Sequence, residues 1–163
     1  MTASVAQQLI AEAEQRGQSV ATAESLTGGL VAAAIVAVPG SSAVYRGGVV
    51  SYATEVKHEL LGVDADLLHE RGAVDATVAQ QMAERARNVL SIVGVPASIG
   101  IATTGVAGPE TQDGHPVGEV FVAVATETST RVERFQFDGG REQIQAQSVA
   151  AALELALEVV QES

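Results

Sequence analysis

The sequence predicts an α/β fold, a three-layer α/β/α sandwich around a mixed, mostly parallel sheet of about five strands. Three observations support this prediction. Amphipathic helical segments alternate with short apolar strand segments, which is typical of a sheet covered by helices on both faces. Only a short polar turn separates the last two strand segments, which indicates one antiparallel hairpin. With 163 residues, of which 47% are hydrophobic, the chain is long enough to bury a core as one domain over residues 1–163.

The first part of the chain alternates helix, strand and helix. Apolar residues at helical spacing predict an opening helix that stops at Gly17, namely Val5, Leu9, Ile10 and Ala13. A strand is then expected over residues 19–24, SVATAE. The small-residue run that starts at Leu26 has the length of a helix and ends at Pro39-Gly40.

The middle of the chain repeats this alternation. A strand is expected over residues 47–52, and the helix after it stops at Gly62. Another amphipathic helix is marked by apolar residues at helical spacing, namely Val78, Met82, Ala86, Val89 and Val93. A buried strand over residues 97–104, ASIGIATT, follows Pro96.

The last part of the chain contains the predicted hairpin and a closing helix. Its two strands are expected over residues 118–126 and 130–138. The closing helix starts near Gly140 and turns a row of apolar residues inward, namely Ile144, Val149, Leu153, Leu157 and Val160.

The composition excludes several classes of function. The chain has no cysteine, which excludes disulfides, thiolate metal sites and a cysteine nucleophile. Its net charge of −11 and lack of a basic cluster argue against binding of nucleic acid. The first residues lack the pattern of a secretory signal, and no apolar run is long enough to span a bilayer. We therefore expect a cytoplasmic protein that binds a small molecule and neither nucleic acid nor a membrane.

The predicted fold directs attention to one edge of the sheet. In open α/β sheets, ligands bind beyond the carboxyl ends of the strands. Three loops are expected there, over residues 24–29, 52–57 and 103–109. They contain the most unusual residues of the chain, so we expect the functional site among them.

The first of these loops, ESLTGG, places Ser25 at a strand-to-helix corner. The backbone N–H groups of the following residues, from Leu26 to Gly29, would be free to bind an oxyanion or a phosphate. Gly28 and Gly29 would let a substrate approach the backbone closely. The alternative interpretation is that Ser25 only caps the helix and that the glycines only pack it against the sheet.

A serine nucleophile requires a base, and Lys57 is the strongest candidate. Desolvation and a position in the first turns of a helix would lower the pKa of its ammonium group from about 10.4. The alternative is an ordinary surface lysine within EVKHE. Tyr52 ends the preceding strand, and its phenol would relay a proton or hold the lysine, unless it is only an interface aromatic.

The remaining candidate residues give weaker signals. The third loop, TTGVAGPETQDGHPVG, is rich in glycine and suits a ligand that is wrapped by backbone groups. Arg141 precedes the last helix and is either an anion clamp or a surface arginine. None of the three histidines has an obvious acidic partner, so a Ser-His-Asp triad is not supported. No metal site is expected, because no set of His, Asp and Glu shows a ligand spacing.

Several segments, in order over nearly the whole chain, resemble the CinA C-terminal domain family. They are TAESLTGG, VPGSSAVYRGGVVSYATEVKHELLGV, GAVDATVAQQMA, TTGVAGPE and PVGEVFVAVAT. The stand-alone members of that family are nicotinamide-nucleotide amidohydrolases, which deamidate nicotinamide mononucleotide to nicotinate mononucleotide and ammonia in pyridine nucleotide recycling. The resemblance implies a serine amidohydrolase without a metal or other cofactor.

The resemblance also implies roles for particular residues. Ser25 matches the nucleophile, Lys57 its base and Tyr52 a supporting hydroxyl. The expected substrate-binding residues are Thr27, Gly28, Gly29, Thr104, Gly105, Gly108 and Arg141. A homo-oligomer is expected as well. A rival hypothesis is a non-catalytic domain of the same fold that binds a nucleotide or a protein, and a weaker one is an amidase for another small amide.

Some positions depart from the family pattern. Leu26 stands where the family often has cysteine, and Asp75-Ala76 replaces a common Ser-Glu pair. His115 replaces a frequent lysine, and Gly139 replaces a frequent aspartate. The last two departures bear on how the phosphate of the nucleotide is held.

Overall fold

The computed structural model, which describes residues 3–163, contains one five-stranded mixed sheet. The strands are β1 (Val20–Glu24), β2 (Tyr45–Val50), β3 (Ile99–Gly105), β4 (Glu119–Ala125) and β5 (Thr130–Gln136). Their order is β2-β1-β3-β4-β5. β1 pairs in parallel with β2 and β3, whereas β4 pairs antiparallel with β3 and β5. Since β4 alone is reversed, the prediction of a mixed, mostly parallel sheet is confirmed.

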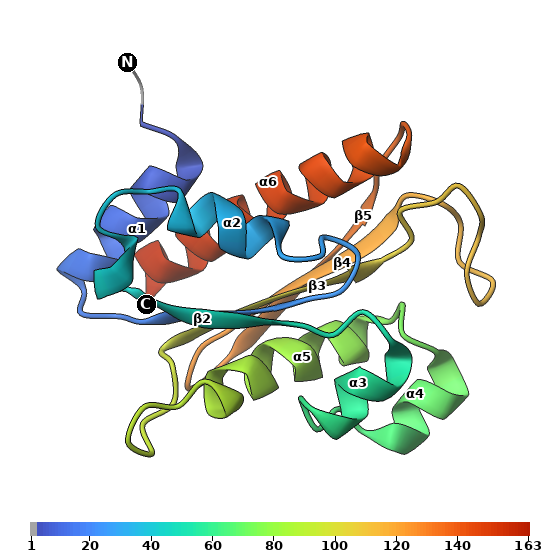
Figure 1. The fold of residues 1–163 in the computed structure, drawn as a ribbon, viewed down its shortest axis with the longest axis horizontal. Helices are drawn as coiled ribbons and strands as arrows, with labels where there is room; N and C mark the ends of the chain where they lie inside the picture. The colour runs from blue at the N-terminus through green and yellow to red at the C-terminus, as the bar shows by residue number, and fades with distance from the viewer. Residues whose placement is uncertain (1–2) are drawn as a thin grey trace.

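Helices cover both faces of this sheet, as Figure 1 shows. They are α1 (Val5–Gln15), α2 (Leu30–Val36), α3 (Thr54–Glu59), α4 (Ala65–Arg71), α5 (Ala76–Val89) and α6 (Arg141–Glu162). α1, α2 and α6 lie on one side, and α3, α4 and α5 lie on the other (Figure 1). The predicted three layers are therefore present. Within the part of the chain that the structure describes, no helix is long and apolar enough to cross a membrane.

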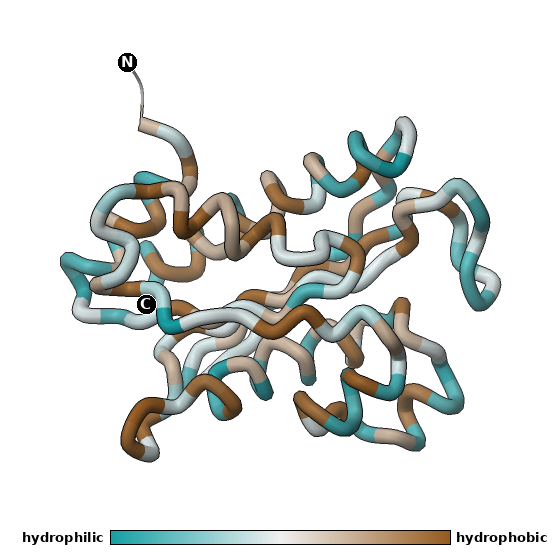
Figure 2. The backbone as a smooth tube through the Cα atoms, viewed as in Figure 1, coloured by the Kyte–Doolittle hydropathy of each residue, from teal (hydrophilic) through white to brown (hydrophobic). Residues whose placement is uncertain are grey.

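The two faces of the sheet are built from different side chains, because neighbouring residues of a strand point to opposite faces. The face under α1 and α6 carries large branched residues, namely Val20, Ile99, Ile101, Val120, Val122 and Val124. The face under α5 carries alanines, namely Ala21, Ala23, Ala102, Ala123 and Ala125. The apolar tube segments in Figure 2 run along these strands. Small residues on the second face allow α5 to approach the sheet closely.

Gly100 is the point of closest approach, so Gly100→Ala should destabilise the fold. A Cβ atom there would lie 2.0 Å from the backbone oxygen of Ala83 in α5. Since a backbone group cannot rotate away, the helix must shift, and we expect a loss of about 3 kcal/mol in the free energy of unfolding. Urea denaturation measures it. The matched control is Gly140→Ala, whose Cβ would meet nothing closer than 3.9 Å and should cost less than about 1 kcal/mol. Equal losses would contradict this account.

Two predicted helix boundaries were wrong. α2 begins at Leu30 rather than Leu26, because Gly28 and Gly29 take left-handed φ values of +55° and +99° and form a turn. α5 ends at Val89, and Val93 lies in a turn with a φ of +51° and a side chain that is 97% exposed. This apolar turn is the hydrophobic tip of the loop between α5 and β3 in Figure 2.

The other differences are smaller. β2 covers residues 45–50 instead of 47–52. α4 was not predicted, although Asp64 caps it by accepting hydrogen bonds from the N–H groups of Asp66 and Leu67. The hairpin of β4 and β5 and the closing helix α6 are confirmed.

Candidate active site

The carboxyl ends of three parallel strands lie side by side at one edge of the sheet. Glu24, the last residue of β1, is paired with Val50 of β2 and Thr103 of β3. The three loops expected to carry the site follow these residues directly. The structure therefore brings the loops together, as the parallel topology requires.

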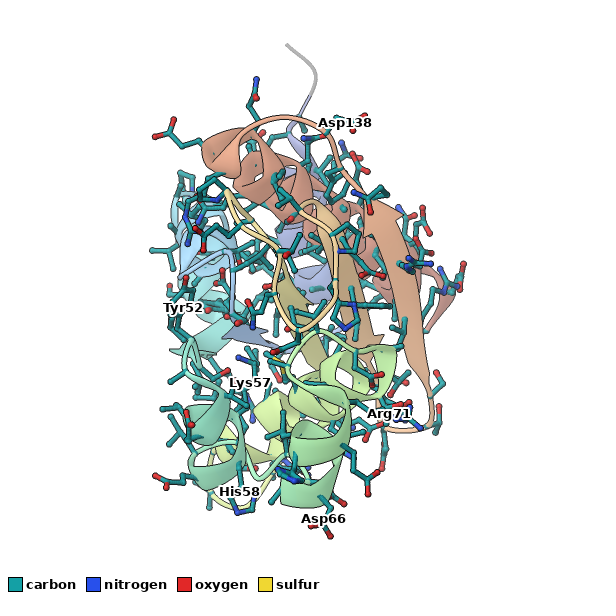
Figure 3. All side chains as sticks on the ribbon, turned by 90° about the vertical axis from the view of Figure 1, so that its right-hand side faces the viewer. Tyr52, Lys57, His58, Asp66, Arg71 and Asp138 are labelled. Atoms are coloured by element: carbon teal, nitrogen blue, oxygen red, sulfur yellow. The ribbon has the colours of Figure 1, made fainter. Side chains whose placement is uncertain are left out.

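Ser25 and Lys57 meet at this edge. Lys57 Nζ lies 2.9 Å from Ser25 Oγ, 2.7 Å from the carbonyl oxygen of Ser51 and 3.3 Å from that of Tyr52. The Lys57 side chain is fully buried, and Ser25 is only 7% exposed. Figure 3 shows Lys57 inside the molecule between α3 and the sheet. The interpretation of Lys57 as a solvated surface residue is therefore wrong.

Burial lowers the pKa of Lys57 from its ordinary value of 10.5 to about 8, and the nearby carboxylate of Glu55 opposes part of that change. The expected help from the helix dipole is absent. α3 has six residues, and Lys57 lies in its last turn, where the dipole favours the ammonium form. Loss of water contact is thus the cause of the lowered pKa.

Glu24 is a buried residue of the site that the sequence analysis did not single out. Its side chain is 1% exposed and accepts hydrogen bonds from Thr27 Oγ1 and from the N–H groups of Gly29, Val31 and Ala32. The N–H groups at the start of α2 are therefore already occupied. A charged residue at the end of the apolar strand VATAE was the available signal.

The turn after Ser25 offers fewer free N–H groups than expected. The N–H of Gly28 donates to the Ser25 carbonyl and that of Gly29 to Glu24. Among residues 3–163, the N–H groups of Leu26 and Thr27 donate no hydrogen bond to another protein group. The N–H group directly after a nucleophile at a strand-to-helix turn is a typical oxyanion donor. Here it belongs to Leu26, which borders the cavity described next, whereas Thr27 is fully buried.

A cavity of about 350 Å³ opens beside this turn. Its walls include Leu26, Tyr52, Gly105, Gly108 and Arg141. Arg141 donates hydrogen bonds to the Gly108 carbonyl at 2.8 Å and to the Tyr52 hydroxyl at 3.0 Å. Four of the expected site residues thus lie around one cavity.

Tyr52 is placed differently from the expectation. Its side chain is 62% exposed and lies at the edge of the molecule (Figure 3), and its hydroxyl contacts Arg141. Lys57 is held by the backbone carbonyl of Tyr52, not by its phenol.

The other expected substrate-binding residues do not line the cavity. The Thr27 hydroxyl is buried against Glu24 and Thr103, and the Thr104 hydroxyl donates to the carbonyl of Ala73. Gly28 and Gly29 shape the turn after Ser25 through their left-handed backbone.

The two departures that concern the phosphate also lie away from the cavity wall. His115 Nδ1 is 2.6 Å from the buried carboxylate of Glu119. Gly139 has a φ of +112°, a backbone conformation that an aspartate rarely adopts.

The histidines and acidic residues suggest no alternative centre. His58 Nδ1 bonds to the carbonyl of Val63, and His58 lies at the far end of α3 in Figure 3. Within the described part of the chain, no group of three His, Cys, Asp or Glu side chains is arranged to hold a metal ion.

One signal in the sequence pointed to Lys57 and was not used. Lys57 is the only lysine of the chain, whose other basic residues are arginines. Since arginine does not lose its proton in proteins, Lys57 is the one side chain of the sequence that can present a neutral amine.

Comparison with known proteins places the chain in a family. The profile of the CinA C-terminal domain matches residues 2–160. A CinA-like protein of Frankia casuarinae is 45% identical over 141 residues, or 86% of this chain and 31% of that protein. A putative competence-damage inducible protein of Desulforamulus reducens is 43% identical over 145 residues, or 89% of this chain and 34% of that protein. The chain thus spans about a third of the length of the curated relatives it matches.

Solved structures agree with this placement. A CinA superfamily protein from Klebsiella pneumoniae has a TM-score of 0.91 at 32% identity and covers 98% of this chain and 97% of its own. A competence/damage inducible protein from Agrobacterium tumefaciens has a TM-score of 0.87 at 35% identity, with 96% and 93% covered. By sequence and by fold, the chain belongs to the CinA C-terminal domain family.

Proposed function

We propose that this chain hydrolyses the carboxamide of nicotinamide mononucleotide, giving nicotinate mononucleotide and ammonia. Ser25 is the nucleophile and Lys57 its base. The observation that carries the proposal is the 2.9 Å contact between Ser25 Oγ and the amine of a fully buried lysine. The choice of substrate rests on the family resemblance.

The surroundings of Lys57 suit a neutral amine. A neutral amine has two N–H donors and one lone pair. Two of its three neighbours are the carbonyl oxygens of Ser51 and Tyr52, which only accept hydrogen bonds. When both N–H groups donate to these carbonyls, the lone pair is left for the hydroxyl proton of Ser25.

The reaction then proceeds through an acyl-enzyme. Lys57 takes the Ser25 proton as Oγ attacks the carboxamide carbon, and the N–H group of Leu26, a residue of the cavity wall, stabilises the oxyanion. Lys57 returns the proton to the leaving nitrogen, which departs as ammonia. A water molecule, deprotonated by Lys57, then attacks the ester carbon, and the proton goes back to Ser25 Oγ. Nicotinate mononucleotide is released and the enzyme is restored.

Arg141 is suited to the phosphate of the substrate. Among the described residues that line the cavity, Arg141 alone is cationic, and its contacts to Gly108 and Tyr52 hold the guanidinium in place. Guanidinium groups bind phosphate through paired N–H donors. The start of α2 is not available for this purpose, because Glu24 occupies its N–H groups.

Incubation of the purified protein with nicotinamide mononucleotide tests the proposal. We expect ammonia and nicotinate mononucleotide in equal amounts, with and without EDTA, and slower hydrolysis of nicotinamide riboside and free nicotinamide. Equal rates on all three amides would exclude a nucleotide-specific site. A folded protein that binds the nucleotide without hydrolysing it would be the non-catalytic domain of the rival hypothesis.

A further inference from the structure

The carboxylate of Glu24 is fully surrounded by donors. Oε2 accepts from Thr27 Oγ1 at 2.6 Å, from Gly29 N at 3.1 Å and from Val31 N at 3.0 Å. Oε1 accepts from Ala32 N at 2.8 Å. A buried carboxylate is tolerated only with such compensation, and all four contacts go to the segment that follows Ser25.

A chain of hydroxyl groups extends this network to the neighbouring strand. Thr27 Oγ1 lies 2.7 Å from Thr103 Oγ1 in β3. Since the single hydroxyl proton of Thr27 is donated to Glu24, Thr103 must donate to Thr27. All three side chains are buried, so no water molecule competes for these hydrogen bonds. Their direction is therefore fixed, from Thr103 to Thr27 and from Thr27 to Glu24.

The backbone of Glu24 reaches the second half of the site. Its carbonyl accepts the N–H of Ser51 at 2.9 Å, and the carbonyl of Ser51 accepts from Lys57. The N–H of Ser25 is held by the Thr103 carbonyl at 3.0 Å. Glu24 therefore lies between the residues that hold the nucleophile and the residue that holds the base.

We propose that Glu24 is a positioning residue that, with Thr27 and Thr103, fixes the turn after Ser25 so that the N–H group of Leu26, a residue of the cavity wall, points at the developing oxyanion. This inference rests on the proposed function and adds the device that builds its oxyanion hole. By binding Thr27 and Gly29, Glu24 holds the turn at two places. The Leu26 carbonyl is held on the other side by Gln145 of α6 at 2.8 Å.

An amide cannot replace this carboxylate. The side chain of glutamine has one acceptor oxygen, and its NH₂ group is a donor. In Glu24→Gln the NH₂ group would face at least one backbone N–H, so the turn would shift. A displacement of about 1 Å near a reacting centre costs about 100-fold in rate, which is comparable to losing an oxyanion donor.

The test compares Glu24→Gln with the wild type at a temperature where unfolding curves show both fully folded. We expect kcat for the nucleotide to fall about 10- to 100-fold, with KM changed less than about twofold and the midpoint of the pH–rate profile unchanged. Asp75→Asn is the matched control, because Asp75 caps α5 through Thr77 and Val78 and lies outside the site. A purely structural role of Glu24 predicts lower stability and an unchanged kcat in both variants, and that result would overturn the proposal.

A second pair of variants applies if Glu24→Gln does not fold. Thr27→Val removes the hydroxyl at nearly constant volume, and Thr27→Ser keeps it. We expect kcat to fall in Thr27→Val and to recover in Thr27→Ser. Equal kcat in both variants would show that the hydroxyl chain does not position the turn.

Labelling with a fluorophosphonate separates this inference from the choice of substrate. Ser25 Oγ would attack phosphorus, fluoride would leave, and Lys57 would take the serine proton, all without a nucleotide. Slower labelling in Glu24→Gln than in the wild type supports the role of Glu24 even if nicotinamide mononucleotide is not hydrolysed. Equal labelling rates would contradict that role, whatever the substrate.

Discussion

Replacing Ser25 with alanine should abolish hydrolysis of nicotinamide mononucleotide, with a loss of about 10⁴-fold or more in kcat. The physical reason is that no acyl-enzyme forms without Oγ, while the neighbouring donors and the cavity remain. The fold should survive, because the N–H of Ser25 still donates to the Thr103 carbonyl and, among residues 3–163, the hydroxyl is hydrogen-bonded to Lys57 alone. We expect the free energy of unfolding to fall by about 1 kcal/mol, because the hydrogen bond to Lys57 is lost. Initial rates of ammonia release and urea denaturation measure the two effects.

Ser41→Ala is the matched control for this experiment. Ser41 is also a buried serine, at 8% exposure, but it precedes β2 at the end of the strand opposite the site. This variant should keep the wild-type rate.

Mass spectrometry of acid-quenched wild-type protein should in addition find a nicotinoyl nucleotide ester on Ser25. A Ser25→Ala protein with the wild-type rate would exclude Ser25 as the nucleophile.

The sequence predicted the layered fold because its signals are local and repeated. Buried strands read as unbroken apolar runs, and the alternation of large residues with alanine in β1, β3 and β4 follows from the strand period. Helix ends were less predictable, because they depend on a few backbone conformations. The left-handed turns at Gly28 and Val93 moved two boundaries by about one helical turn.

The site was predictable in outline for a different reason. Parallel strands bring their carboxyl ends to one edge, so Ser25 and Lys57 could be assigned to neighbouring loops from the order of elements alone. The burial of Lys57 could not be deduced, because EVKHE is typical of a surface helix. The contacts of Glu24 depend on a chain reversal over residues 25–32, which returns four donors to one carboxylate. Such a contact depends on the backbone path, not on residue type.

Lys57 carries the second large prediction, because a base with a pKa of about 8 would set the pH dependence of the proposed reaction. We expect kcat/KM to rise with pH and to level off above a midpoint near 8, since only the neutral amine accepts the serine proton. At pH 7 about a tenth of the molecules would be active. Lys57→Met should remove activity, and Lys57→Arg should not restore it, because guanidinium keeps its proton. A flat profile from about pH 6 to 9, or activity in the arginine variant, would exclude a lysine base.

The pKa itself is directly measurable, because Lys57 is the only lysine of the chain. Protein grown with ¹³C-labelled lysine would give a single side-chain Cε signal, and its titration would report this residue alone. We expect the midpoint near 8 in the folded protein and near 10.5 after denaturation. A folded-state midpoint near 10.5 would mean that the amine stays charged at neutral pH, and Ser25 would then lack its base.

The titration of the Lys57 amine also makes the free energy of unfolding depend on pH. Below pH 8, Lys57 is protonated in both states, and the buried ammonium weakens the folded protein. Between pH 8 and 10.5 the unfolded chain binds more protons than the folded one, so the free energy of unfolding rises with pH through this window and levels off above it. The variant Lys57→Met contains all the other titrating groups, so their effects cancel when its free energy of unfolding is subtracted from that of the wild type. This difference should rise by about 3 kcal/mol across the window. If the two free energies of unfolding differ by the same amount at every pH, the pKa of Lys57 is not lowered. A difference that rises with pH would show that burial destabilises the charged amine, and the neutral amine is the form that the proposed base requires.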